Sequence, residues 1–452
     1  MNISLDKRIS ALIDQRDFLN DVRKNHWCIL KRSVLEEEHA IMYKLLVLVF
    51  VALAAAQKAS YENYKVFRVL PLQESQLNVL RQIEDHDGFA LWNGPSHVNM
   101  TVDVMVAPSK FGEFVDLMNL IGTPYASYID NVQALIDTET SSVVRSTTRF
   151  SYSVYHTLQE IYAHLDDLAE QHPNNVEVII GGKSYEGRQI KGIKLSFGES
   201  KPGIVLEGGI HAREWISPAT VLYIIDQLLN SQDPEVRALA EGNDWYIFPN
   251  ANPDGYVYTH TKNRLWRKTR KPYSTFCYGS DPNRNWGYKW NTGGASSNPC
   301  SETYAGSSAF SEVETRTLSE YLTSISDKFY AFISFHSYSQ LLLFSYGHTT
   351  AHIGNYDELY AIGKKSIDAL AQRYGTEYRL GNVAETIYVA TGSSLDWVKG
   401  SLGKPISYTY ELRDKGRYGF LLPENQIIPT GEETLDSLVA MFKEAAKRGY
   451  PN

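Results

Sequence analysis

Apolar positions between residues 176 and 412 fall into short runs that alternate with segments of helical spacing. Each run has the length and the β-branched or aromatic content of a buried strand. This alternation predicts an α/β domain built on a mixed, mostly parallel sheet with helices on both faces. The expected strands are VEVIIGG, IKGIKLS, GIVLEGG, DWYIFPN, FYAFISF and PISYTYEL, and the expected helices lie near residues 217–230, 311–326, 357–373 and 432–448.

A different pattern occupies residues 64–137. KVFRVLPL is a predicted strand, and VNMTVDVMVA alternates as a half-buried strand should. ESQLNVLRQIED and PSKFGEFVDLMNLIG carry helical spacing, and YASYIDNVQALI is expected to close the pattern as a strand. With a short strand at FALW, the order β-α-β-β-α-β predicts a small ferredoxin-like α+β unit.

A polar stretch separates the two patterns. DTETSSVVRSTTRF is rich in Ser and Thr, which is linker composition, and its Arg145 or Arg149 would suit a trypsin-like protease. A helix is expected directly afterwards, because Thr157 and Glu160 have the spacing of a capping box and Pro173 ends the apolar pattern. We therefore expect a boundary at residues 145–146.

The segment Met42–Ala56 holds a lysine, an apolar run and small residues, as a secretory signal peptide does. As a helix the run would be about 18 Å long, too short for the roughly 30 Å hydrocarbon core of a membrane. Signal peptides begin chains, so we expect translation to start at Met42 and residues 1–41 to be an upstream extension. The alternative is that residues 1–41 are translated and the run is a short anchor or a masked signal.

Charge and cysteine content narrow the class of protein. A net charge of −8 without a basic tract argues against nucleic acid as a partner. Of the three cysteines, Cys28 lies in the doubtful extension, whereas Cys277 and Cys300 enclose a loop rich in Gly, Ser and Asn. In an oxidising compartment a disulfide there would stabilise the fold by about 3 kcal/mol. Two free buried thiols are the alternative.

Candidate metal ligands follow the expected strands. GIVLEGGI leads into His211 and Glu214, and FYAFISF leads into His336. Because sites in open α/β sheets gather at the carboxyl ends of strands, these three side chains are expected to converge. Two His and one Glu leave a position open, as catalytic zinc requires. Taken singly, each histidine is also compatible with a hydrogen-bonded structural role.

Other polar side chains suggest a reaction. In ISYTYEL the period of two places Glu411 on a face opposite Tyr408 and Tyr410, where it is either a general base or a solvated partner of Arg413. Among the loop arginines are Arg213, Arg267 and Arg284, the last beside Asn283. Such groups bind carboxylates bidentately and stabilise oxyanions, although basic surface residues are the alternative.

Six motifs together resemble the zinc metallocarboxypeptidases of the carboxypeptidase A/B group. They are HAREW, NRLWRKTR, DPNRNW, FHSYSQLLLFSYG, TIYVATGSSLDW and YELRDKGRYGFLLPENQI. The resemblance covers residues 146–452, the expected catalytic domain, and residues 57–145 resemble the family's inhibitory pro-domain with its linker. It implies a secreted zymogen that hydrolyses the C-terminal bond of peptides with a free C-terminus after activation by a trypsin-like protease.

The resemblance also implies roles for single residues. The zinc ligands would be His211, Glu214 and His336, with one Zn²⁺ per catalytic domain. Glu411 would activate the zinc-bound water, and Arg267 would hold the oxyanion together with zinc. The implied substrate-binding residues are Arg213, Asn283, Arg284, Tyr338 and Tyr388, and the implied disulfide joins Cys277 and Cys300.

Leu395 matches the position at the pocket floor where the family's branches differ. An aspartate there would select Lys or Arg, whereas burying an unpaired ammonium against leucine would cost several kcal/mol. The sequence therefore predicts release of aliphatic or aromatic residues, with a pocket altered by Ser393, where many members have glycine. The alternatives are a B-type enzyme that releases Lys or Arg and an inactive binding protein. We expect a monomer that contacts no membrane in its mature form.

Overall fold

The computed structural model describes residues 23–24, 42, 58–140 and 150–451. Almost all of the extension and of the expected signal peptide, and both candidate cleavage sites, Arg145 and Arg149, lie outside the described residues. Within the described ranges, every helix is too short or too polar to cross a membrane. Residues 59–140 are called the N-terminal subdomain below, and residues 150–451 the C-terminal subdomain; both belong to one compact unit.

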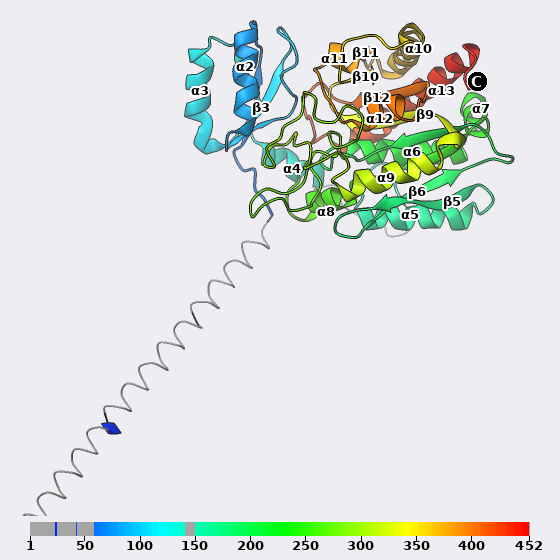
Figure 1. Cartoon of the computed structure of the whole chain (residues 1–452), viewed down its shortest axis with the longest axis horizontal. Helices are drawn as coiled ribbons and strands as arrows, with labels where there is room; N and C mark the ends of the chain where they lie inside the picture. The colour runs from blue at the N-terminus through cyan, green and yellow to red at the C-terminus, as the bar shows by residue number, and fades with distance from the viewer. Residues whose placement is uncertain (1–22, 25–41, 43–57, 141–149, 452) are drawn as a thin grey trace, which may run out of the picture. The chain divides into compact units, whose positions relative to one another are not determined.

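The N-terminal subdomain has the predicted β-α-β-β-α-β order (Figure 1). Its antiparallel sheet has the strand order β2-β3-β1-β4. Its elements are β1 (Lys65–Val69), α2 (Glu74–Gln82), η1 (Ile83–Asp85), β2 (Phe89–Leu91), β3 (Val102–Val106), η2 (Pro108–Lys110), α3 (Phe111–Leu120), β4 (Tyr125–Ile129) and α4 (Val132–Thr140).

Two predictions for this subdomain are wrong. The final strand ends at Ile129, and α4 follows, because Val132, Leu135 and Ile136 have the spacing that packs one face of a helix. The strand β3 was expected to be half-buried, yet all five of its residues are buried. Its second face is covered because Met105 packs against the C-terminal subdomain.

The C-terminal subdomain contains an eight-stranded mixed sheet of order β11-β10-β12-β9-β7-β8-β6-β5. The pairs β7–β8, β7–β9, β9–β12 and β10–β11 are parallel. The elements are α5 (Leu158–Gln171), β5 (Val176–Lys183), β6 (Gln189–Leu195), β7 (Gly203–Glu207), α6 (Ile216–Asn230), α7 (Pro234–Glu241), β8 (Asp244–Phe248), α8 (Pro253–Thr261), α9 (Val313–Ser324), η3 (Ser326–Lys328), β9 (Phe329–Ser337), β10 (Leu341–Phe344), α10 (Tyr356–Tyr374), β11 (Arg379–Asn382), α11 (Val383–Thr386), α12 (Ser394–Gly400), β12 (Ile406–Leu412), η4 (Glu424–Gln426) and α13 (Ile427–Lys447).

All six predicted strands and the four predicted helices of this subdomain are confirmed. The capping box is also present, since Glu160 N donates to Thr157 Oγ1 and Thr157 N donates to the Glu160 carboxylate. The prediction missed β10 and β11, which have only four residues each, and several short helices. Short elements give too few repeats of a period to be recognised.

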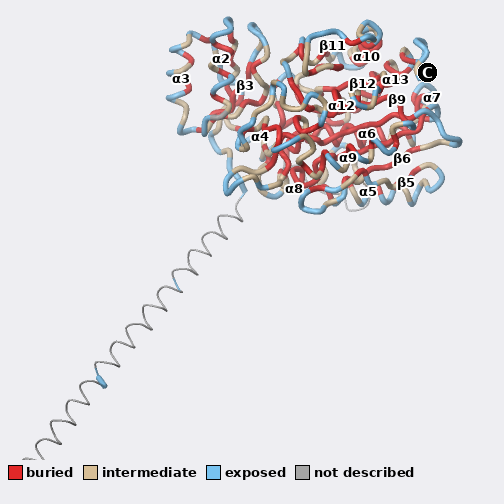
Figure 2. Tube along the Cα trace, in the orientation of Figure 1, coloured by how far each residue is buried: buried red, intermediate tan, exposed pale blue. Residues whose placement is uncertain are grey.

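Alternate residues of the central strands face opposite layers. Ile204 and Leu206 of β7 join the cluster formed with α5, α6, α10 and α13, whereas Val205 joins the cluster formed with α9 and α12. The strands are buried along their length, as the red tube in Figure 2 shows. The second layer, called the α12 face below, carries the candidate site.

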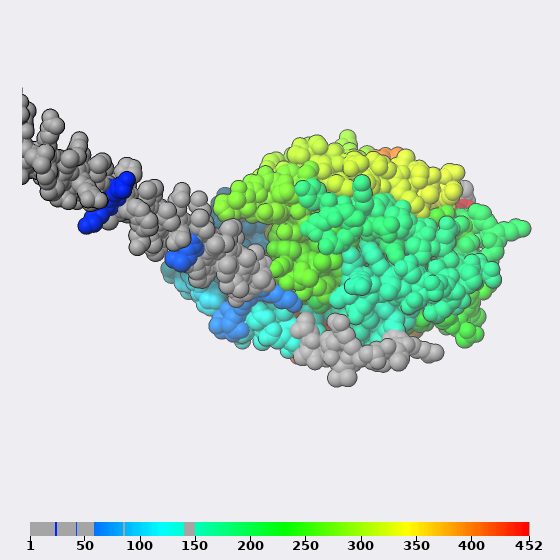
Figure 3. All heavy atoms as spheres, turned by 90° about the horizontal axis from the view of Figure 1, so that it is seen from below, coloured from blue at the N-terminus to red at the C-terminus, as the bar shows by residue number. Residues whose placement is uncertain are grey.

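The two subdomains are joined by polar contacts as well as apolar ones. Ala59 N donates to Lys262 O, and Figure 3 shows this blue start of the subdomain against green atoms of the C-terminal subdomain. At the other end of the N-terminal subdomain, Glu139 of α4 forms a buried ion pair with Arg264, with a Nε–Oε2 distance of 2.6 Å. Both ends of the N-terminal subdomain therefore contact the large one.

Candidate functional site

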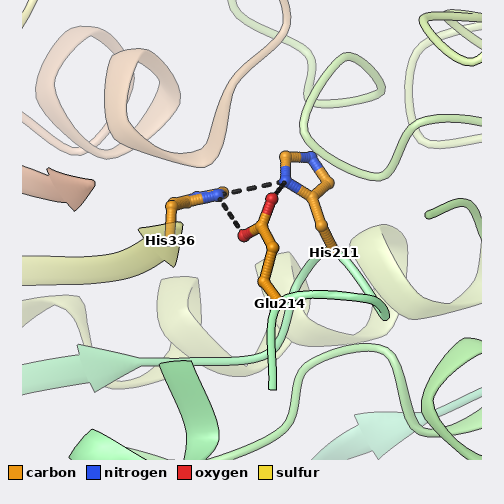
Figure 4. A group of neighbouring side chains, drawn as sticks. All are labelled: His211, Glu214 and His336. Carbon is orange, nitrogen blue, oxygen red and sulfur yellow. Dashed lines mark hydrogen bonds and ion pairs between the residues drawn. The ribbon is translucent and has the colours of Figure 1, made fainter. Parts of the chain in front are cut away.

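Three buried side chains converge beyond the carboxyl ends of β7 and β9 (Figure 4). The chain leaves β7 through Gly209, whose φ of 62° is in the left-handed region. A Cβ there would lie 3.0–3.1 Å from Asn250, so glycine is required both for the turn and for the close approach. This turn directs His211 and Glu214 toward His336, which lies near the end of β9.

The atoms of this group form a compact donor set. His211 Nδ1 lies 2.8 Å from Glu214 Oε1, and His336 Nδ1 lies 3.1 Å from Glu214 Oε2. The two Nδ1 atoms are only 3.1 Å apart. Two imidazole nitrogens and a carboxylate directed at one point suit a divalent cation such as Zn²⁺, which takes N and O ligands. Each prediction of a ligand position therefore agrees with the geometry.

Charge inside the group explains the direction of its pKa shifts. Burial alone would raise the pKa of Glu214, but the two histidines hold it well below its usual value. Burial lowers the pKa of His211, assisted by the nearby Arg267. Burial therefore favours the neutral form of the His211 ring, which is the form that binds metals.

Asp281, the first residue of the DPNRNW motif and not a predicted site residue, organises this region. Its Oδ1 lies 3.0 Å from His211 Nε2 and accepts a hydrogen bond from Asn283 N at 2.8 Å. Its Oδ2 accepts from Arg267 Nη2 at 2.7 Å. A carboxylate on the second nitrogen of a ligand histidine fixes the ring and its tautomer. The signal available was an acid two residues before an Asn-Arg pair.

Glu411 lies beside the group because of strand register. It is the neighbour of His336 across the parallel ladder between β12 and β9. Among the described residues its carboxylate has no hydrogen-bond partner, and Arg413 pairs with Glu433 instead. Burial and repulsion by Glu214 raise the pKa of Glu411 to about 8. The arrangement holds an unpaired carboxyl group that can exchange a proton next to the donor set.

Arg267 and Arg284 approach from the loops after α8. Arg267 is held by Asp281, and its Nη1 lies 3.9 Å from Glu214 Oε1. Arg284 is buried and donates to the carbonyls of Asn283 and Gly294. These bonds fix two guanidinium groups next to one another, with Asp281 between them.

Tyr388 and Asn283 complete this side of the site. Arg284 Nη2 lies 3.5 Å from the Tyr388 hydroxyl. Asn283 Oδ1 accepts from Ser394 N at 3.0 Å, and its Nδ2 lies 3.5 Å from His336 Nε2. The predicted carboxylate-binding residues therefore lie in one place.

A cavity of about 1160 Å³ contains these residues. Leu395, which is 3% exposed, lines it, as do other apolar side chains of the α12 face. Ser393 caps α12, with its hydroxyl accepting from Asp396 N at 3.1 Å. The apolar residues that line the cavity with Leu395 include Leu343, Val383, Ile387, Val389 and Ala390.

Arg213 and Tyr338 lie at the side of the cavity that meets the N-terminal subdomain. The guanidinium of Arg213 stacks on Phe420 at 4.1 Å and lies 3.6 Å from Glu302. The Tyr338 hydroxyl donates to Asp103 of β3 at 2.9 Å. Tyr338 is therefore engaged by the N-terminal subdomain in this structure.

The loop that carries much of the site is closed covalently. Cys277 and Cys300 form a disulfide with a Cα–Cα distance of 4.7 Å. The alternative of two free thiols is therefore excluded.

Comparisons with known proteins agree with this geometry. Residues 161–437 match the zinc carboxypeptidase family, and residues 67–139 match the carboxypeptidase activation peptide. The chain is 50% identical to zinc carboxypeptidase A 1 of Anopheles gambiae over 89% of this chain and 94% of the relative. It is 41% identical to carboxypeptidase A1 of Bos taurus over 90% of this chain and all of the relative.

Solved structures give the same result. Carboxypeptidase A from Helicoverpa armigera matches with a TM-score of 0.79 and 29% identity, over 87% of this chain and 100% of that one. Thrombin-activatable fibrinolysis inhibitor also has a TM-score of 0.79, at 33% identity, over 86% of this chain and 100% of that one. The matched activation peptide lies in the N-terminal subdomain, and the matched catalytic family spans the sheet that carries the His-Glu-His group. The chain belongs to the zinc carboxypeptidase family, as a metallocarboxypeptidase zymogen that carries its activation peptide and a catalytic Zn²⁺ site.

Proposed function

We propose that this zymogen is secreted and, once activated, releases aliphatic or aromatic residues from the C-termini of peptides. One observation carries the proposal: the apolar Leu395, the cation Arg284 and the unpaired carboxyl of Glu411 line the same cavity as two members of the His-Glu-His group, His211 and Glu214. Relatives named carboxypeptidase A in Anopheles gambiae and Bos taurus support the same preference.

Recognition of the substrate's end is assigned to Arg284 and Asn283. A guanidinium binds a carboxylate through two parallel hydrogen bonds, and the neighbouring amide adds a third donor. The Tyr388 hydroxyl, 3.5 Å from Arg284 Nη2, is near enough to cover a carboxylate bound there. Arg213 and Tyr338 would contact residues further from the C-terminus. Peptides with a blocked C-terminus should not bind productively.

Glu411 is assigned as the base and then the acid of the reaction. When bound by His211, Glu214 and His336, Zn²⁺ supplies a Lewis acid that polarises the scissile carbonyl and the attacking water. Glu411 takes the proton from that water and later returns it to the leaving amine. Arg267 stabilises the negative charge that develops on the carbonyl oxygen. Its ion pair with Asp281 holds the guanidinium in position.

Selectivity follows from the floor of the cavity. An aliphatic or aromatic side chain would bury apolar area against Leu395, at about 25 cal/mol per Å². A lysine ammonium or arginine guanidinium would lose its water there without gaining a counter-ion. The B-type alternative therefore requires an acid elsewhere in the pocket.

Latency is assigned to the N-terminal subdomain. Residues of its loop from Trp92 to Thr101 line the same cavity as Glu411 and Arg284. A Cβ on Gly94 would come within 3.0 Å of the Tyr388 ring, so the loop lies directly against this tyrosine. Cleavage by a trypsin-like protease at Arg145 or Arg149 would free the cleft.

The test uses the full chain, assayed before and after nicking with trypsin. Blocked dipeptides that end in Phe, Leu or Arg are compared, each with and without a zinc chelator. We expect chelator-sensitive release of Phe and Leu after nicking only. The matched variant is Leu395→Asp, which should lose Phe release and gain Arg release.

The outcomes separate the parts of the proposal. Release of Arg by the unaltered chain would contradict the assignment of Leu395 and leave the mechanism in place. Equal activity before and after nicking would contradict latency. No release of any residue, with zinc bound and the activation peptide removed, would favour an inactive binding protein. Secretion is tested separately, by expression from Met42 in an insect cell line and analysis of the medium.

A further inference from the structure

A buried carboxyl group without a cationic partner lies on the α12 face, behind the candidate substrate pocket. Glu207 is the last residue of β7 and is 1% exposed. Its Oε2 accepts hydrogen bonds from Ser334 Oγ at 2.8 Å and from Ser394 Oγ at 2.9 Å. Among the described residues no Lys or Arg forms an ion pair with it, and its Oε1 has no hydrogen bond. Burial raises the pKa of Glu207.

Burying a carboxyl group without a cationic partner costs folding free energy, so we examined which elements Glu207 connects. Ser334 lies two residues before the ligand His336 on β9, and it is the register neighbour of Glu207. Ser394 is the first residue of α12 and directly precedes Leu395. Glu207 thus joins the strand that carries a metal ligand to the helix that carries the pocket floor.

Ser394 has a second contact on its other side. Its backbone N–H donates to Asn283 Oδ1 at 3.0 Å. Because the amide oxygen is engaged there, the Nδ2 of Asn283 is turned away from α12, toward His336 Nε2 at 3.5 Å. One serine therefore connects the buried carboxyl, through its hydroxyl, to an amide at the cavity, through its backbone.

We infer that Glu207 is a positioning residue: by holding Ser394 it fixes the amide of Asn283 at the cavity, where that amide would bind the substrate carboxylate, and fixes Leu395 at the pocket floor. The inference rests on the proposed function, because it assumes that Asn283 binds the C-terminal carboxylate. Glu207 touches neither the substrate nor the metal ligands' donor atoms. Its loss is therefore expected to weaken binding of the carboxylate more than the chemical step.

The experiment compares Glu207→Ala, Glu207→Gln and Ser394→Ala in the nicked enzyme. Glutamine keeps one oxygen that can accept from both serines, so Glu207→Gln is the conservative rescue. For Glu207→Ala and Ser394→Ala we expect KM for a blocked dipeptide ending in Phe to rise about 10-fold or more, with kcat changed less than 3-fold. The Ki of 3-phenylpropionate, which offers only a carboxylate and a ring, should rise in parallel.

Coupling to Asn283 gives a second readout. If Glu207 acts through Asn283, adding Glu207→Ala to Asn283→Ala should change KM and Ki little. The values for the double variant should lie within about 2-fold of those for Asn283→Ala alone. The matched control is Glu314→Gln, another buried carboxyl, which lies on α9 with its Oε1 accepting from Tyr185 N. Its KM and Ki should equal those of the unaltered enzyme.

Several results would overturn the inference. These are a loss in kcat alone, full additivity with Asn283→Ala, or a Glu207→Gln enzyme as weak as Glu207→Ala. If Glu207→Ala does not fold, Ser394→Ala, which removes one hydroxyl, and Glu207→Gln still decide the matter. If the unaltered enzyme releases no Phe at all, the proposed function fails. If the unaltered enzyme releases Phe and the Ser394→Ala enzyme has the same KM and Ki, only the role of Glu207 fails.

Discussion

The two sheets of this protein are both buried on two faces, but by different means. The eight-stranded sheet is covered by its own helices, with α6 and α13 in one layer and α9 and α12 in the other. The four-stranded sheet covers one face with α2 and α3. On its other face Val66, Met105 and Ile129 pack against Leu265, Tyr338 and Phe420 of the large subdomain.

This difference shows which part depends on the other. The large subdomain completes its core and its candidate site with its own residues. The small subdomain completes the burial of its sheet only while docked. Removal of the activation peptide should therefore leave the catalytic fold nearly unchanged and expose apolar residues on both sides of the contact, such as Met105 on the fragment and Phe420 on the large subdomain.

The largest expected effect tests whether the candidate site is independent of the surface that docks the activation peptide. Glu411→Gln keeps the shape of the side chain and removes its ability to take a proton. The kcat/KM of the nicked enzyme should fall about 10³-fold, as loss of a general base does. The midpoint of thermal unfolding and the retention of the activation peptide before nicking should not change. A change in that retention would mean that the site and the docking surface are not independent.

The second expected effect concerns the ion pair between Glu139 and Arg264. Both side chains are buried, so Glu139→Gln leaves a guanidinium without its counter-ion and should cost about 3 kcal/mol of docking. After nicking, gel filtration should show the activation peptide dissociating at a much higher protein concentration than in the unaltered enzyme. The control is Glu113→Gln, because Glu113 pairs with Lys110 at the surface and should contribute under 1 kcal/mol. Equal behaviour of both variants would contradict the assignment.

The smallest expected effect uses two neighbouring residues of β3. Val104 faces α2 and α3, whereas Met105 faces the large subdomain. Alanine at either position should cost about 2 kcal/mol. For Val104 the loss should be in the stability of the fragment, and for Met105 in its docking to the large subdomain. Val104→Ala should lower the unfolding midpoint of the separated fragment, and Met105→Ala should lower only its retention after nicking. If both variants change the same measurement, the two faces do not differ as described.

The sequence was informative wherever a residue's position depended on local repetition. The alternation in ISYTYEL predicted which side chains share a face, and so placed Glu411 opposite Tyr408. His211, Glu214 and His336 were found because strand ends converge in a parallel sheet.

Features that depend on a partner distant in sequence were missed. The full burial of β3 results from Tyr338 and Phe420, which no local pattern could connect to it. Asp281 gained its importance from contacts with His211 and Arg267, which approach from separate loops. The helix α4 was taken for a continued strand because YASYIDNVQALI has too few residues to separate the two periods.

One consequence of the ladder between β9 and β12 concerns which parts of the enzyme can vary. His336 and Glu411 face each other in register, so their separation is that of two hydrogen-bonded strands, about 4.8 Å between backbones. Loops can lengthen, shorten or change composition without altering this spacing. Changes in the loops that carry Arg267 and Asn283 therefore leave the spacing of His336 and Glu411 unaltered, because the backbone of the two paired strands sets it.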